Sequence, residues 1–160
     1  MSGFDPQMDP TLFLGEFTRI RVVDPAAPGP PMVGNLVIDP AKDFDIEVEW
    51  NLKGFFVPLW LAALGGNWVI EAYAESVGPG QEKMIASKVV PVGTPVQPKT
   101  YSEKLRVSAG QLQEHTPGPA GPSGVYKLTV TAFLNSTLGT PGYDIAGFVE
   151  GPVIRAENPI

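Results

Sequence analysis

Apolar and polar residues alternate without interruption over residues 43–53. The apolar positions hold Phe44, Ile46, Val48, Trp50 and Leu52, and the positions between them hold only charged residues or asparagine. Successive side chains of a β-strand point to opposite faces, so this period of two places all of the apolar side chains on one face. The segment therefore predicts a strand with one wet face, as in an antiparallel sheet that is packed on one side only.

Shorter stretches with the same alternation predict further strands at fairly regular intervals. We expect them over residues 17–23, 34–38, 68–75, 83–92, 100–108, 125–135, 143–149 and 153–155. Glycine and proline, 18 of each in 160 residues, supply the turn signals between them. No long amphipathic helix is indicated, and only residues 111–115 are expected to form a helical turn. The pattern predicts an all-β, antiparallel sandwich of about eight strands.

The length of 160 residues indicates one domain with a substantial core. Residues 1–16 contain Pro6 and Pro10 and are expected to form an extended N-terminal arm whose Phe13 region docks on the body. Residues 17–160 are then the single β-sandwich domain.

Residues 121–130 read Gly-Pro-Ser-Gly-Val-Tyr-Lys-Leu-Thr-Val and resemble the entry to a late strand of immunoglobulin-like sandwiches. In that family a tyrosine follows a glycine-rich corner and its hydroxyl bonds to nearby backbone; Tyr126 holds this position. The resemblance implies an immunoglobulin-like fold over about residues 34–155, with Trp50 as the buried tryptophan. The chain has no cysteine, so the resemblance is to cysteine-free members. It carries no catalytic residues and implies no function by itself.

Composition narrows the possible partners. A net charge of −6 and a pI near 4.7 disfavour nucleic acid and anionic membranes, which attract basic surfaces. The absence of cysteine excludes disulfides, thiol nucleophiles and zinc–thiolate sites. No signal peptide or transmembrane segment is recognised, so we expect a cytoplasmic protein, with secretion kept as an alternative.

Few residues suggest chemistry. The acids between residues 43 and 49 suggest either a calcium site or a solvated face, and we favour the solvated face because alternate residues of a strand lie about 7 Å apart. The loop acids Asp24, Asp39 and Asp144 stay open as calcium ligands. His115 is the only histidine, lies in a proline-rich stretch and has no nucleophile motif with it. We therefore predict no catalytic, cofactor or metal site, and keep a hydrolase with paired carboxylates as a minor alternative.

Residues 54–66 are the one apolar segment that does not alternate, and no charge occurs between residues 54 and 70. Proline at position 58 interrupts it, and it is too short to span a bilayer. It is interpreted first as a buried crossover between sheets, and otherwise as an exposed patch that binds a partner or as a membrane-dipping loop. The candidate interface residues are Phe55, Phe56, Leu59 and Trp60.

The sequence thus favours a non-enzymatic structural or protein-interaction module that works in an assembly, through self-association or a protein partner. The alternatives are a ligand-binding module or an accessory domain of a larger system. A ligand-binding module would hold carbohydrate on Trp60, Trp68 or Tyr143, or calcium on the loop acids.

Overall fold

The computed structural model describes residues 2–139 and 144–158 and consists almost entirely of antiparallel strands in two sheets. The larger sheet has the order β1 (Ser2–Asp5), β9 (Ile145–Ala156), β8 (Val125–Leu134), β5 (Asn67–Ser76), β6 (Glu82–Pro91). A short β3 (Val37–Ile38) lies parallel to the end of β9. The smaller sheet has the order β2 (Leu14–Val23), β4 (Phe44–Lys53), β7 (Lys99–Val107). The predicted all-β, antiparallel class is confirmed.

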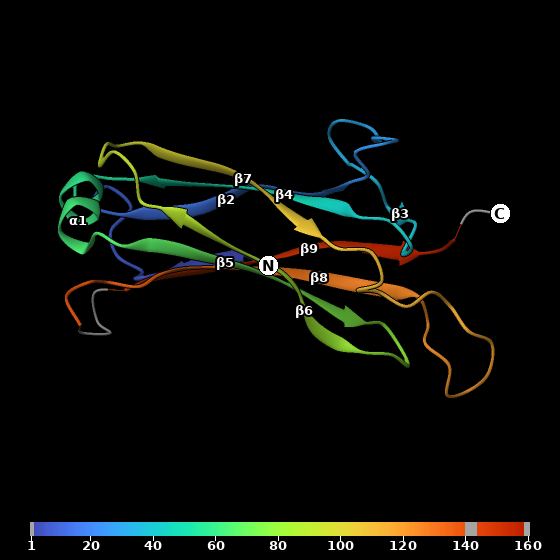
Figure 1. Ribbon diagram of the computed structural model, residues 1–160. Coiled ribbons are helices and arrows are strands. Elements are labelled where there is room, and N and C mark those ends of the chain that lie inside the picture. The colour runs from blue at the N-terminus through green and yellow to red at the C-terminus, as the bar shows by residue number, and fades with distance from the viewer. Residues whose placement is uncertain (1, 140–143, 159–160) are drawn as a thin grey trace.

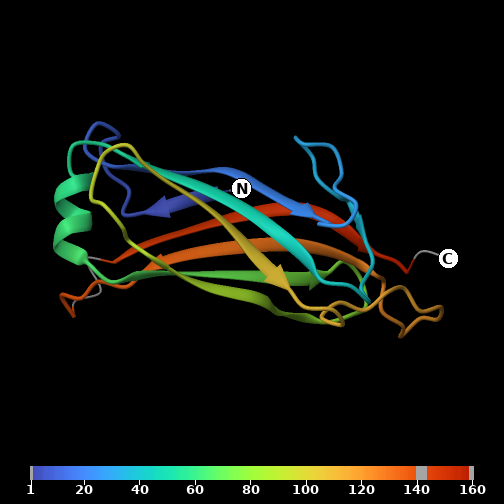
Figure 2. The same ribbon diagram turned by 45° about the horizontal axis from the view of Figure 1, so that its top comes forward.

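Figures 1 and 2 show the two sheets face to face, with their strands running along the long axis of the molecule and the helix α1 (Val57–Leu64) at one end. The core lies between the sheets. Every apolar side chain of β4 is buried, and so is every second residue of β8 from Tyr126 to Leu134. Trp50 of β4 stacks on Tyr101 at 5.0 Å between ring centroids and meets Trp68 of β5 edge-on at 5.6 Å. The alternation in the sequence therefore marks the inward face correctly.

The outer face of the smaller sheet carries ion pairs between side chains of neighbouring strands. Glu47 lies opposite Arg21 on β2, and their side chains approach to 2.8 Å. Asp45 lies opposite Arg106 on β7 and is paired with it. Opposite charges across neighbouring strands stabilise the pairing of the sheet. Asp45 is only 7% exposed, so the expectation that all of these acids are solvated was wrong at this residue, because strands on both sides flank it and its carboxylate is occupied by a guanidinium.

Several strand boundaries differ from the prediction. Residues 143–149 and 153–155 were expected to be separate strands, but the described part of this region is the single strand β9. A register shift opposite Lys127–Thr129 of β8 accommodates Gly151 and Pro152 within it, because a bulge leaves room for a residue that cannot donate to the ladder. Residues 111–115 do not form a helical turn.

The N-terminal segment adds a strand to the larger sheet. β1 pairs with β9, and Phe4 is buried and stacked on Phe17 at 4.8 Å. A slot for Phe4 exists because Gly15 and Gly147 have no side chain: a Cβ on either would lie within 2.6 Å of the Phe4 ring. Phe13 is also buried, as expected. Residues 1–16 thus contribute both a strand and core side chains.

Candidate interaction surface

Helix α1 connects β4 to β5 across one end of the sandwich (Figure 1). Pro58 lies in its first turn, where proline is tolerated because the amide there has no helical partner. Val57, Leu61 and Leu64 are buried, at the i, i+4, i+7 spacing of one helix face. The inward face of the helix thus closes the end of the core.

The outward side of the same segment is also apolar. Phe55 is 77% exposed, Leu59 is 69% exposed and Phe56 is 36% exposed. Trp60 is partly buried, because its ring meets Phe13 edge-on at 5.4 Å. Of the predicted interface residues, Phe55, Phe56 and Leu59 thus face outward, and Trp60 is half-buried against Phe13. Buried and exposed residues both occur along the segment, so it is neither wholly a buried crossover nor wholly an exposed surface.

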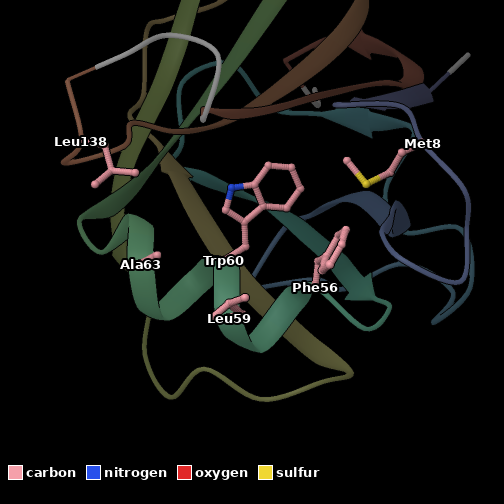
Figure 3. A pocket seen from close by; sticks show the side chains of 6 residues that line it. All are labelled: Met8, Phe56, Leu59, Trp60, Ala63 and Leu138. Atoms are coloured by element: carbon pink, nitrogen blue, oxygen red, sulfur yellow. The ribbon is translucent and has the colours of Figure 1, made fainter.

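An apolar hollow of about 320 Å³ lies beside these residues. Figure 3 shows the ring of Trp60 standing in its middle, with Met8 and Phe56 on one side and Leu138 on the other. Its lining residues come from three connections of the chain: Met8, Phe56, Leu59, Trp60, Ala63 and Leu138. We call this hollow together with the exposed Phe55 the apolar end.

Sequence reasoning did not select Ala63 within the apolar segment, and it missed the two lining residues that lie outside residues 54–66. Met8 precedes β2 and Leu138 follows β8, and neither has an apolar residue directly beside it in the sequence. Neither shows a pattern that distinguishes it from other loop residues. Only the strand topology, which brings both connections to the end that carries α1, places them together.

The lining residues of the hollow include no ionisable side chain, so they offer no acid or base. The other sequence candidates lie elsewhere. His115 is exposed in the connection between β7 and β8. Within residues 2–139 and 144–158, no three acidic or histidine side chains are grouped to hold a metal ion.

The loop acids are engaged locally rather than converging. The Asp24 carboxylate accepts a bond from the Ala26 amide, Asp39 from Ala41, and Asp144 from Ser136 at 2.7 Å. Asp144 follows β8, at the end of the sandwich away from the connections that hold Asp24 and Asp39. The three acids therefore do not form one calcium site.

The aromatic residues considered for carbohydrate binding are also dispersed. Trp68 is fully buried in the core and cannot stack on a sugar, so that expectation was wrong. Its position on β5 alternates with outward residues and points it inward. Tyr143 lies outside the described residues. Of the two described residues, Trp60 is the one that stands at the apolar hollow.

No protein-family model matches the chain, and no curated protein matches it. A solved structure of a β-glucosidase from Erythrobacter marinus is similar to the chain with a TM-score of 0.46 and 8% sequence identity. The match covers 91% of this chain and 16% of the glucosidase chain. A likeness of this extent carries no argument about the activity. In the described part of the chain, no helix has the length and apolar character needed to cross a bilayer.

Proposed function

We propose that this chain is a non-catalytic protein-interaction module with an immunoglobulin-like strand order, and that it holds its partner with the apolar end. The strand order supports the first half of the proposal. If β2, β4 and β7 are taken as strands A, B and E, and β6, β5, β8 and β9 as C′, C, F and G, the order is consistent with an immunoglobulin-like arrangement, to which β1 adds an edge strand beside G.

Two side chains support the same assignment. The Tyr126 hydroxyl, at the start of strand F, donates to the carbonyl of Gln113 at 2.8 Å and accepts from its amide at 3.0 Å. A tyrosine that ties the corner before strand F to upstream backbone is a feature of this fold. Strand C carries Trp68, which is buried against Trp50. In this assignment Trp68 takes the place of the buried tryptophan that the sequence had suggested for Trp50.

The observation that carries the binding proposal is the exposure of Phe55 and Leu59 beside the apolar hollow. Phe55 contacts Phe56, which lines the hollow together with Leu59, so these residues form one contiguous apolar surface, and such surfaces mark interaction sites. Aromatic residues in a pocket are the usual anchors of protein interfaces. The hollow has no polar lining to bond the hydroxyl groups of a sugar, so a protein partner fits it better.

The location fits the proposal as well. α1 lies in the connection between strands B and C, and Leu138 lies in that between F and G. In immunoglobulin variable domains these connections share one end of the sandwich and form the binding surface.

A photo-crosslinking amino acid at position 59 tests this function in cells that express the chain. The matched control carries the same group at Val89, which is exposed on the edge strand β6. We expect a discrete protein adduct from position 59 and none from position 89, with the adduct identified by mass spectrometry. Equal labelling at both positions, or none at position 59, would show that the apolar end is not a binding surface.

A further inference from the structure

A second exposed apolar feature lies in the connection between β2 and β3. Met32 is 92% exposed and Val33 is about half exposed. No charged residue occurs between Asp24 and Asp39. We call residues 25–36 the Met32 loop.

The Met32 loop is held in one shape by its own hydrogen bonds. The Asn35 side-chain oxygen accepts from the amides of Asp24 and Gly29, both at 2.9 Å, and its nitrogen donates to the carbonyl of Ala27 at 2.9 Å. Gly34 closes the tip with a φ of +76°, a conformation that suits glycine, and its amide donates to Pro30 at 2.7 Å. A pre-formed loop loses little conformational entropy on binding, so it suits the role of an inserted knob.

The knob and the hollow lie at opposite ends of the sandwich. Val23, which leads into the Met32 loop, pairs with Asp45 near the start of β4, whereas Lys53 at the other end of β4 leads to α1. A strand of ten residues spans about 33 Å. Figures 1 and 2 show α1 and the connection after β2 at the two ends of the long axis.

We propose that the partner of the apolar end is a second copy of this chain, whose Met32 and Val33 insert into the hollow around Trp60. This inference rests on the proposed function and names its partner. The hollow of about 320 Å³ is roughly twice the ~150 Å³ apolar cavity that accommodates benzene, so it has room for aliphatic side chains of this size. No charged residue lines the hollow or lies within residues 25–36, so the contact buries no charge.

The charge of the chain disfavours contact through the charged sheet faces more than contact through the loop and the hollow. Each copy carries a net charge of −6, which opposes close approach of the charged sheet faces. Contact between the uncharged ends keeps those faces apart. Because the knob and the hollow are different surfaces, the contact is heterologous, and it repeats from copy to copy into a ring or an open filament.

Light scattering on the purified chain over a concentration series tests the inference with Met32→Asp and Leu59→Asp. Both residues are largely exposed, so neither change disturbs the core. We expect the wild type to grow beyond a dimer with concentration, and each variant to associate at least about tenfold more weakly, because a charge enters the apolar contact. Met84→Asp, at an exposed methionine of β6, is the matched control and should behave as the wild type.

Mixing the two variants gives the decisive readout. The Met32→Asp chain keeps an intact hollow and the Leu59→Asp chain keeps an intact loop, so an equimolar mixture should form dimers and nothing larger. A wild type that stays monomeric throughout, or a mixture without dimers, overturns the inference. Loss of association in Leu59→Asp alone also overturns it, because the apolar end would then contact another copy without the loop.

The crosslinking experiment separates this inference from the function on which it rests. Adducts of position 59 with peptides of the Met32 loop support both the interaction function and self-assembly. An identified adduct with a foreign protein only supports the interaction function and overturns self-assembly. The absence of any specific adduct contradicts both.

Discussion

β4 and the segment after it are both rich in apolar residues, but only in β4 does the sequence reveal which side chains are buried. In β4 the charged residues mark the wet face, and every apolar residue between them is buried. In residues 54–66 no polar side chain marks a face. Leu59 and Leu61 are two residues apart, yet one is 69% exposed and the other 1%.

The comparison teaches that hydrophobicity alone does not determine burial. A polar residue in phase with a strand removes one face from consideration, because burying its charge would cost more than the neighbouring apolar groups gain. An uninterrupted apolar run leaves both faces possible. The position of α1 at the end of the sandwich then determines which of its side chains are buried, since only one side of the helix meets the core.

The most severe test of the patterned region is Val48→Asp. Val48 is buried at the centre of β4, and an aspartate there would be desolvated without a partner. Since domains are stable by only about 5–15 kcal/mol, we expect the variant to be unfolded at room temperature by circular dichroism. Glu49→Ala, on the wet face beside it, should cost less than about 1 kcal/mol. A Val48→Asp chain that melts like the wild type would show that the facing of β4 is wrong.

The strands could be predicted because their patterns are local. The alternation from Tyr126 to Leu134 fixes the inward face of β8, just as that of β4 does. The apolar hollow could not be predicted, because Met8 and Leu138 meet α1 only through the topology of the sheets. The positions of Trp50 and Trp68 in different sheets could not be predicted for a similar reason: their local patterns resemble each other, and only the strand order distinguishes them.

The unpatterned segment is tested by Leu61→Ala against Leu59→Ala. The two changes remove the same atoms from the same helix, so helix propensity cancels. Leu61→Ala should cost about 2–5 kcal/mol, because it leaves a cavity in the core. Leu59→Ala should stay within about 0.5 kcal/mol of the wild type. Urea denaturation gives both values, and equal losses would mean that the face assigned to the core is incorrect.

Tyr126→Phe tests how β8, whose residues alternate, holds the connection before it, whose residues do not alternate. The alternation of β8 buries the ring of Tyr126, but its hydroxyl is what ties down the chain at Gln113, by one donated and one accepted bond. Removing the hydroxyl leaves both backbone groups without these partners and should cost about 1 kcal/mol.

The matched control for this variant is Tyr73→Phe on the outer face of β5. The Tyr73 hydroxyl donates to the Glu71 carboxylate, a bond that raises the pKa of the tyrosine, and water can replace that partner. We expect a change below about 0.5 kcal/mol there. Hydrogen exchange locates the effect: the Gln113 amide should exchange faster in Tyr126→Phe, while the amides of β8 keep the protection set by the sheet. Unchanged exchange at Gln113 would mean that contacts other than the hydroxyl hold this connection. The two bonds of the Tyr126 hydroxyl would then contribute nothing to the fold.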